Sequence, residues 1–574
     1  MKQLGMVLGA GLLALASCED VIDLDPVDDR AAVEASVRPK PISGGTLLVT
    51  ADGLAVAADP DRDRVYLVDV PERAVRGTVI LEPGDEPGRV VEGSEGRVHV
   101  VLRGFGGVAT LDRTEGTVLA RRWVCPDPRG LAHDAERGEL LVACADGALV
   151  HLDEATGQER LRAVLEPDLR DVVLVDGQPH VSQFRTAKLL REYGSPTSPR
   201  ALDDFQAHVA WRTVVDPESG RITMLHQLAS VSPVPIEPDP EDLREDEPLP
   251  YGGGGGFCRP GIVSAAVTTV DPDGAIRTTP VPNAALAVDM AVSPKGWVAL
   301  ALPGRATSTV AVLPSPEDGC FLVSDEAEDQ GQVTAVAFQG SDTLVMQSRE
   351  PARILVKTDP FGGPVDVIEL PGESRFDTGH EIFHRATESG LSCASCHPEG
   401  ADDGHVWDFI GLGPRRTQVL DIGIGDTAPF HWDGDMGDLD VLMVEVLAHR
   451  MGGMRQSAER SDSFRRWVFD QRRPPADAGG DDATLVAAGE DLFVSLDCVR
   501  CHAGPDLGGT MTTPVRGQDL QVPSLRRVSL RPPFMHDGRS RTIEDAVRDM
   551  IVSTTAFDIE EDEVAALSAY MRTL

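Results

Sequence analysis

Short β-branched segments, separated by glycine, proline and aspartate turns, recur through the first two thirds of this chain. Between Gly44 and Pro371 the spacing between copies is roughly 40–45 residues, close to the length of a four-stranded propeller blade. Helical periodicity is almost absent from this stretch. The clearest copies are residues 46–50, 55–59, 65–69, 97–101, 107–112, 139–143 and 148–153, and later copies centre on Val173, 208–225, 287–312 and 333–356. The pattern predicts an all-β propeller of about seven blades; the competing interpretation is a two-sheet sandwich.

The repeat region resembles bacterial β-propellers of the YVTN type in its rhythm. One insertion interrupts it, because Glu237 to Pro250 is acidic and proline-rich and Gly252 to Gly256 is an unbroken glycine run. Such a composition cannot bury a core, so we expect a loop. The loop is interpreted as a tolerated surface insertion, with docking of a partner as the alternative.

Two Cys-x-x-Cys-His motifs follow the repeats, at Cys393–His397 and at Cys498–His502. This spacing is the attachment pattern of c-type haem, in which both thiols bond to the porphyrin and the histidine binds the iron. The alternatives are a zinc knuckle or a redox dithiol, but zinc requires four ligands close together and these motifs lie about a hundred residues apart. The sequence therefore predicts two covalently bound haem c groups, haem 1 on Cys393 and Cys396 and haem 2 on Cys498 and Cys501.

The N-terminus has the features of an export signal. Lys2 precedes the apolar run 6–16, which ends in Leu15-Ala16-Ser17-Cys18. The run is too short to span a bilayer comfortably. Its last four residues resemble a bacterial lipobox, which implies a lipid on Cys18; an ordinary signal peptide is the alternative. We expect a protein anchored on the periplasmic side of the bacterial cell envelope, with inner or outer membrane left open.

Cysteine counting agrees with an exported protein. Of nine cysteines, removing Cys18 and the four in the haem motifs leaves an even number, which favours disulfides. We favour pairing of sequence neighbours, and the two other pairings stay open. The favoured pairs are Cys125–Cys144 and Cys258–Cys320.

The formal charge of −40 restricts the partners. It argues against binding nucleic acid or an anionic membrane surface through charge. Solubility alone explains such a charge, and the functional interpretation is an acidic face that attracts a basic electron-donor protein.

Helical patterns replace the strands after about Ser374. Residues 461–471 and 482–493 show helical spacing, and 560–574 places an apolar stripe on one face, as the closing helix of a cytochrome c domain does. The expected units are a signal peptide (1–17), a tether (18–43), the propeller (44–371), a haem 1 domain (374–475) and a haem 2 domain (480–574). Pro474-Pro475 to Gly480 is expected to link the haem domains.

The C-terminal 200 or so residues resemble the bacterial dihaem cytochrome c peroxidase family, which includes the dihaem enzyme that matures a tryptophan-derived quinone. The motifs that carry the resemblance stand in the family's order. They are residues 392–397, 405–407, 413–415, 430–434, 522–526, 533–538 and 546–550. The propeller lies outside the resemblance, which makes the chain a fusion.

The resemblance implies roles for individual residues. His397 and His502 would be the proximal iron ligands, and Met550 would supply the thioether of the high-potential haem 2, with Met535 as the fallback. His405 matches the family's displaceable distal histidine on haem 1, with His431 and His449 as alternatives. Trp432 matches the aromatic residue between the haems, where an indole can carry an electron.

Two departures from the family concern proton transfer and calcium. The family uses a glutamate near the peroxidatic haem, whereas here Glu445 does not align cleanly and His449 is the alternative. The family often holds calcium between its domains, but Arg416 and Arg531 stand where it offers oxygen ligands, so calcium is not expected. We expect these arginines to give fixed positive charge to the haem propionates.

These observations predict a lipid-anchored dihaem cytochrome with peroxidase-like activity. Electrons from a small donor protein, such as a c-type cytochrome or a cupredoxin, would enter at haem 2, pass Trp432 and reduce hydrogen peroxide at haem 1. The alternatives are oxidation of a partner protein or an organic substrate, and a non-enzymatic electron carrier with the propeller as a docking scaffold.

Overall fold

The structure is a computed structural model of the 574-residue chain. It describes residues 27–192, 194–236, 251, 260–282, 284–305, 308–320, 323–324, 331–473, 482–554 and 558–574. The predicted export signal with Cys18, the insertion apart from Tyr251, Cys258 and the predicted linker at 474–480 lie outside these residues. Within the described part, no helix combines the length and the apolar character needed to cross a membrane.

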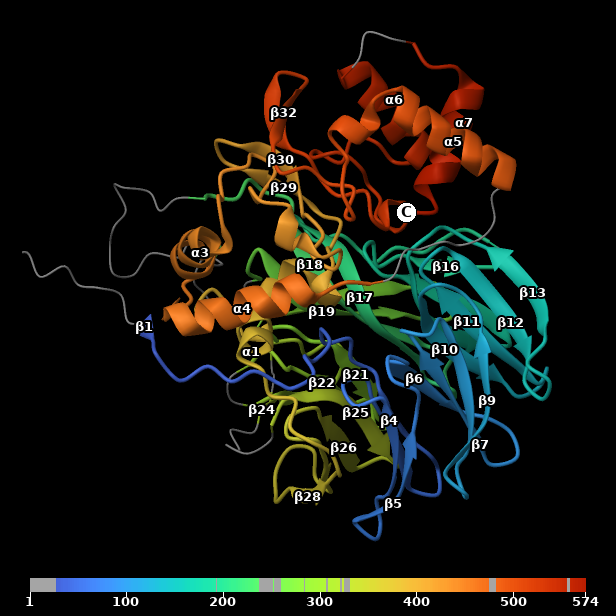
Figure 1. The fold of residues 1–574 in the computed structure, drawn as a ribbon. Coiled ribbons are helices and arrows are strands. Elements are labelled where there is room, and N and C mark those ends of the chain that lie inside the picture. The colour runs from blue at the N-terminus through green and yellow to red at the C-terminus, as the bar shows by residue number, and fades with distance from the viewer. Residues whose placement is uncertain are drawn as a thin grey trace, which may run out of the picture.

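Seven consecutive antiparallel sheets form the propeller, and the prediction of about seven blades is confirmed (Figure 1). The first three blades are β2 (Leu47–Val49), β3 (Leu54–Asp59), β4 (Arg64–Asp69) and β5 (Ala74–Ile80); β6 (Pro87–Glu92), β7 (Arg97–Leu102), β8 (Gly107–Asp112) and β9 (Thr117–Trp123); β10 (Pro128–Asp134), β11 (Glu139–Cys144), β12 (Ala148–Asp153) and β13 (Glu159–Val164). The fourth is β14 (Leu169–Val175), β15 (Gln178–Gln183) and β16 (Leu189–Arg191). The last three are β17 (Phe205–Val215), β18 (Ile222–Ser230), β19 (Val263–Val270) and β20 (Ile276–Val281); β21 (Asp289–Val292), β22 (Val298–Ala301), β23 (Val310–Leu313) and β24 (Val323–Ser324); β25 (Val333–Gln339), β26 (Thr343–Ser348), β27 (Arg353–Lys357) and β28 (Asp366–Glu369).

Burial along each blade explains why these sequences form strands. Middle strands such as β3 and β18 are buried along their whole length, and β3 consists of leucine, alanine and valine up to its last residue, Asp59. Outer strands such as β9 and β13 are largely exposed and carry more charge. Neighbouring blades pack through shared apolar clusters, which is how a propeller buries sheets that could not bury their faces alone.

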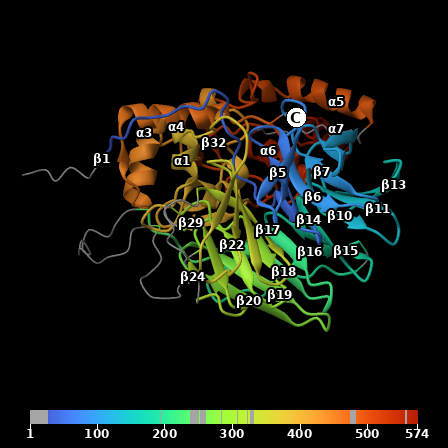
Figure 2. The same ribbon diagram turned by 90° about the horizontal axis from the view of Figure 1, so that it is seen from below.

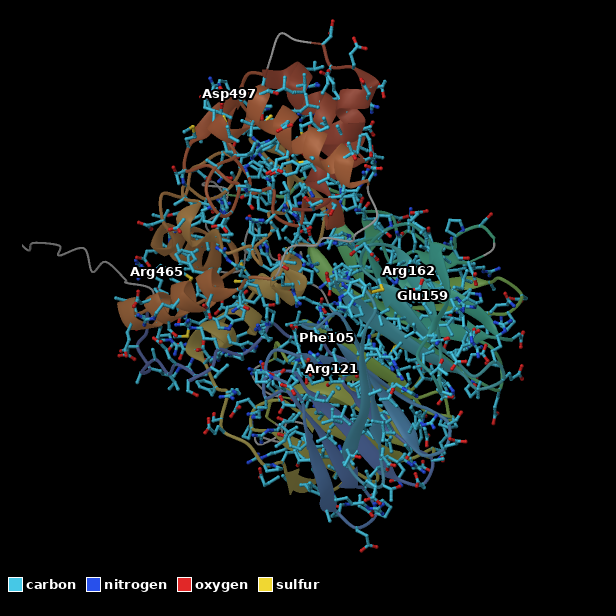
Figure 3. The ribbon with its side chains drawn as sticks, turned by 45° about the vertical axis from the view of Figure 1, so that its right-hand side comes forward. Phe105, Arg121, Glu159, Arg162, Arg465 and Asp497 are labelled. Carbon is cyan, nitrogen blue, oxygen red and sulfur yellow. A yellow bond between two sulfur atoms is a disulfide. The ribbon has the colours of Figure 1, made fainter. Side chains whose placement is uncertain are left out.

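A disulfide fixes the third blade to the loop that enters it. Cys125 and Cys144 are bonded, so this predicted pair is confirmed. Figure 3 shows the bond beside Arg162, whose guanidinium donates to the carbonyl oxygen of Val124 at 3.0 Å. Cys320 is also disulfide-bonded.

The region after the propeller is mainly helical, as predicted, and covers one side of the propeller (Figures 1 and 2). Its helices are α1 (Thr378–His384), α2 (Cys393–Cys396), η1 (Pro398–Gly400), η2 (Ile424–Asp426), α3 (Leu439–Leu442), η3 (Met443–Arg450), α4 (Ala458–Asp470), α5 (Ala483–Ser495), η4 (Cys498–Arg500), η5 (Val528–Leu530), α6 (Ile543–Thr554) and α7 (Glu561–Met571). Its strands are β29 (Val406–Phe409), β30 (Gly413–Arg416), β31 (Arg455–Gln456), β32 (Thr512–Val515) and β33 (Gln518–Gln521).

The segment predicted as a tether packs onto this helical region. Its strand β1 (Val27–Asp28) pairs in parallel with β31. Further along, the indole nitrogen of Trp467 donates to the carbonyl oxygen of Pro39 at 3.0 Å. Residues 27–43 therefore join the propeller to the helices.

Buried ion pairs hold the propeller against the segment that follows the first haem motif. Glu399 receives hydrogen bonds from Arg103 of the second blade and Arg170 of the fourth. Asp402 accepts from Arg185, with Nε and Oδ1 3.0 Å apart. All five side chains are at least nine-tenths buried. The propeller and the helical region are therefore joined by buried, ion-paired side chains.

Candidate haem site

One continuous cavity connects the two Cys-x-x-Cys-His motifs. It has a volume of about 840 Å³, near the upper end of the usual range for ligand pockets. All four motif cysteines and both motif histidines line it, together with many apolar side chains. Two motifs about a hundred residues apart in sequence therefore face the same interior space.

The thiols are suited to covalent attachment of a porphyrin. Cys393, Cys396, Cys498 and Cys501 are not in disulfides. Burial raises the pKa of Cys393 to about 12 and raises that of Cys498 in the same direction, so these thiols are neutral. Neutral thiols in an apolar cavity fit thioether bonds to a haem.

Each motif histidine is held so that one ring nitrogen is left for a metal. His397 Nδ1 lies 3.2 Å from the carbonyl oxygen of Ala401, and His502 Nδ1 lies 3.1 Å from that of Leu507. A carbonyl partner makes Nδ1 the donor, so Nε2 carries the lone pair. Burial lowers the pKa of both imidazoles, which favours the neutral, ligating form. The residues therefore fit covalently bound haem c.

The two motif regions also share a repeated turn and helix. Phe430 bridges to Met436 and Phe534 bridges to Ser540, and in both cases the next residue, His431 or Met535, has positive φ. The offset is 104 residues, and with the same offset α6 repeats the continuous helix formed by α3 and η3. Each repeat has a two-stranded hairpin, β29–β30 in the first and β32–β33 in the second, and each hairpin contacts the turn of the other repeat. A Cβ on Gly434 would lie 2.5 Å from Thr512 of β32, and one on Gly538 would lie 2.5 Å from Val406 of β29.

This repeat pairs each residue near the first motif with one near the second. Met550 on α6 corresponds to Val446 on η3, and both line the cavity. A thioether can bind iron, whereas an isopropyl group cannot. Met535, the fallback ligand, also lines the cavity and corresponds to His431.

Trp432 lies in the cavity where the two repeats meet. Its indole nitrogen donates to the carbonyl oxygen of Arg416 at 2.6 Å. Its ring centroid is 6.1 Å from that of His536, the corresponding residue of the second repeat. The main chain of Gln521, from the second repeat, donates to the carbonyl oxygen of Trp432 at 2.7 Å. Trp432 is therefore fixed between the halves that carry the two motifs.

The structure does not bring His405 into the cavity. Its ring is buried against the propeller, where Nδ1 lies 2.8 Å from Gln206 Nε2 and Nε2 lies 3.1 Å from the carbonyl oxygen of Ser230. Both ring nitrogens are occupied, and the ring packs on His208 with centroids 5.0 Å apart. The structure therefore places His405 in the interface with the propeller, and not where a distal iron ligand would have to lie.

Glu445 and His449, the two candidates for proton transfer, are likewise outside the cavity. They lie one turn apart on η3 with His449 Nδ1 3.5 Å from Glu445 Oε2, and both side chains are 48% exposed. The helix turns its other face inward, since Leu442, Val446 and Arg450 line the cavity. The structure thus gives neither candidate access to a bound substrate.

Several cavity residues were missed or given little weight from the sequence. Tyr251, Asp435 and Arg450 were not predicted, and His431 was only an alternative. The 104-residue repeat is the signal that could have found the last three, because it aligns His431, Asp435 and Arg450 with Met535, Arg539 and Thr554. No comparable signal exists for Tyr251, which comes from the propeller insertion.

Arg416 and Arg531 lie together between the halves and line the cavity. Arg416 Nη2 donates to the carbonyl oxygen of Arg531 at 2.9 Å and to Asp402 Oδ1 at 2.7 Å. Arg416 Nε is buried without a hydrogen-bond partner. An unpaired donor of this kind fits an anionic group in the cavity.

Comparisons with known proteins show similarity to cytochromes c and to cytochrome c peroxidases. Residues 486–574 match the family described as cytochrome c. A cytochrome c551 peroxidase of Nitrosomonas europaea is 26% identical over 298 residues, covering 40% of this chain and 85% of the relative. That of Pseudomonas aeruginosa is 26% identical over 289 residues, covering 37% and 82%. The predicted resemblance to cytochrome c peroxidases is confirmed.

Solved structures resemble the chain more weakly. A chain of Kuenenia stuttgartiensis hydrazine synthase aligns with a TM-score of 0.45 and 13% identity, covering 57% of this chain and 99% of that one. A virginiamycin B lyase from Staphylococcus aureus aligns with a TM-score of 0.39 and 11% identity, covering 56% and 94%. Neither likeness is close enough to carry a function.

Proposed function

We propose that the chain is a lipid-anchored dihaem c-type cytochrome of the bacterial cell envelope that reduces hydrogen peroxide with electrons from a small donor protein. Covalently bound haem would supply the one-electron chemistry and the activation of peroxide. Cysteines 393, 396, 498 and 501 would hold the two groups, and His397 and His502 would bind the irons. The relatives' name, cytochrome c551 peroxidase, supports both the substrate and a cytochrome as donor.

The difference between Met550 and Val446 carries this proposal. At equivalent places on two repeated helices, one motif faces a thioether and the other faces a side chain with no donor atom. A histidine–methionine pair raises haem potential, which suits the site that accepts electrons. With no donor atom at the place of Val446, the first site leaves room there for a substrate. The asymmetry supports a storage role for haem 2 and a catalytic role for haem 1.

Trp432 supports coupling between the two sites. It lies between the repeats, in contact with His536 and fixed by main-chain bonds to both halves. An indole in this place can pass an electron. The net charge of −40 supports a donor with a basic face, attracted through long-range electrostatics.

Spectroscopy of the half-reduced protein tests the proposal. One electron per molecule should reduce haem 2 alone, leave haem 1 with an open coordination site, and give rapid peroxide consumption. Two irons that stay six-coordinate, with no reaction with peroxide, would contradict the proposal. That result would identify the chain as an electron carrier.

A further inference from the structure

Four polar side chains gather at the end of the cavity that belongs to the first motif. Tyr251, His431, Asp435 and Arg450, here called the polar set, all line the cavity. His431 contributes to the electrostatic environment of His397, and Tyr251 packs with Cys396 in one apolar cluster. The polar set therefore lies beside the first motif.

His431 and Asp435 form the first half of the polar set. His431 Nδ1 lies 3.4 Å from Asp435 Oδ1, with both residues on the tight turn that precedes α3. Burial acts to raise the pKa of Asp435, but His431 and Arg450 outweigh it and lower the pKa. The carboxylate is therefore ionised at neutral pH and can orient the imidazole, so that the second ring nitrogen is free to exchange protons.

Arg450 and Tyr251 form the second half. Arg450 Nη1 donates to Tyr251 Oη at 3.4 Å, and the main-chain nitrogen of Tyr251 donates to the carbonyl oxygen of Arg450 at 3.1 Å. Tyr251 also stacks on Phe409 with centroids 6.1 Å apart. Burial raises the pKa of Tyr251, which keeps the phenol neutral. The propeller thus contributes a phenol that holds the last residue of η3 in place.

The second repeat has the same turn and helix but different side chains at the positions of the polar set, so the fold does not by itself require these polar residues. Near the second motif, the places of His431, Asp435 and Arg450 are taken by Met535, Arg539 and Thr554. Arg539 is engaged by Asp549, with Nη2 and Oδ2 2.6 Å apart. The His431–Asp435 pair and Arg450 therefore have no counterpart at the equivalent positions of the second repeat. A different cluster stands there, in which Arg539 Nη1 lies 2.8 Å from Asp537 Oδ1 and 3.4 Å from His536 Nδ1.

We propose that His431 is the proton-transfer residue and Arg450 the charge-stabilising residue for cleavage of peroxide beside the first motif, with Asp435 and Tyr251 as their positioning residues. This inference rests on the proposed function and names residues that carry it out. The O–O bond of hydrogen peroxide breaks as the two oxygen atoms accept two electrons, one from each of two molecules of the reduced donor protein. His431 takes a proton from one peroxide oxygen and gives it to the other, and two protons from solvent complete two molecules of water. Arg450 stabilises the negative charge on the departing oxygen.

Cyanide binding to the half-reduced holoprotein, in which haem 1 is still ferric, tests His431 without using turnover. Hydrogen cyanide loses its proton when it binds ferric haem, so a base in the pocket speeds association. His431→Gln should slow cyanide association by about 100-fold, the lower range for a general base. His449→Gln, the same change on the exposed face of η3, should leave the rate within about twofold.

The outcomes separate the two proposals. If wild type binds cyanide and His431→Gln binds it equally fast, the role of His431 is overturned and the proposed function stands. If wild type binds no cyanide, haem 1 has no open site, and the proposed function falls together with this inference.

Arg450 gives an independent measurement. Arg450→Thr introduces the side-chain type of the equivalent residue, Thr554, and should lower kcat for peroxide by about 100-fold, as expected for loss of one charge-stabilising donor. KM for the electron donor should not change, and Arg450→Lys should recover at least about tenfold of the loss because it restores the charge. A wild-type kcat in Arg450→Thr, or no recovery in Arg450→Lys, would overturn the role of Arg450.

Discussion

At the scale of single residues, the two halves of the cavity differ by a few substitutions in a common framework. The turn, the helix and the motif histidine recur, while Met550 is exchanged for Val446. Because an axial thioether favours the ferrous form of iron, one residue can set which haem is reduced first. The division of labour that we propose therefore depends on side chains and not on two different folds.

Replacing Met550 tests this division. Met550→Ala should abolish the sulfur-to-iron absorption band near the red end of the spectrum. It should also lower the higher of the two reduction potentials by on the order of 0.1–0.2 V, part of the roughly 0.8 V range that axial ligands set. Potentiometry with optical detection measures both. Met535→Ala, in the same cavity, is the matched control and should change neither; if it alone removes the band, Met535 is the ligand.

Replacing Trp432 tests the coupling of the two sites. Trp432→Leu should leave both haems attached but slow peroxide turnover by about 100-fold, equivalent to about 2.7 kcal/mol in the barrier. Steady-state turnover with a reduced donor gives the rate. Trp123→Leu makes the same change on the exposed outer strand β9 and should have no effect. Wild-type turnover in Trp432→Leu would mean that electrons reach haem 1 by another route.

At the scale of elements, the segment from His397 to His405 is bound by the propeller. The side chains of Glu399, Asp402 and His405 all form hydrogen bonds to residues of the propeller, on blades two, four and five respectively. A short segment that carries an iron ligand is thereby given the rigidity of a large β-domain. The propeller is consequently part of the haem environment.

Glu399→Gln tests this contact. Burial acts to raise the pKa of Glu399, but Arg103 and Arg170 outweigh it and hold the pKa below its usual value. A lowered pKa means that the stabilisation is present above pH ~4.3 and is lost as the pH falls further. Glu399→Gln leaves buried guanidiniums without their carboxylate and should lower the free energy of unfolding by about 3–5 kcal/mol at neutral pH. The difference from wild type should become smaller in acid.

Thermal unfolding of the holoprotein at pH 7 and pH 3 measures both parts of this prediction. Glu561→Gln is the matched control: Glu561 pairs with Arg548 but is 80% exposed, so its replacement should leave the melting temperature unchanged. Equal melting temperatures for Glu399→Gln and wild type at pH 7 would show that the interface does not depend on this ion pair.

The elements themselves were largely predictable from local pattern. Period-two alternation and turn residues gave the seven blades, and helical spacing at 482–493 matched α5 (Ala483–Ser495), because both signals are local. The place of His405 was not predictable, since its partners Gln206 and Ser230 are about two hundred residues away and belong to another domain. The inward face of η3 was misjudged because a rotation of the helix by part of a turn decides whether Glu445 or Arg450 reaches the cavity.

At the scale of the whole molecule, the negative net charge and the proposed lipid anchor bear on the place in the cell where the protein acts. The net charge of −40 suits attraction of a basic donor, and the lipid proposed on Cys18 would place the haem domains near a membrane surface. Cys18→Ser should give an exported, haem-loaded protein that no longer partitions with membranes. Fractionation after a salt wash measures this, and retention of the variant on membranes would exclude Cys18 as the anchor.

The number of haems per chain is the broadest test of the whole architecture. The cytochrome c match covers residues 486–574 and so includes only the second motif. A haem at the first motif is inferred from its likeness to the second motif. Both motifs have two free thiols and a histidine whose Nδ1 lies beside a carbonyl oxygen, and both line the same cavity. Mass spectrometry of the intact protein should therefore show the polypeptide plus two haems. The double variant Cys393→Ser/Cys396→Ser should retain one haem and its high-potential signal, while losing peroxide turnover. A wild-type mass with a single haem would leave Trp432 with no second redox centre to connect, and the peroxidase proposal would fail with it.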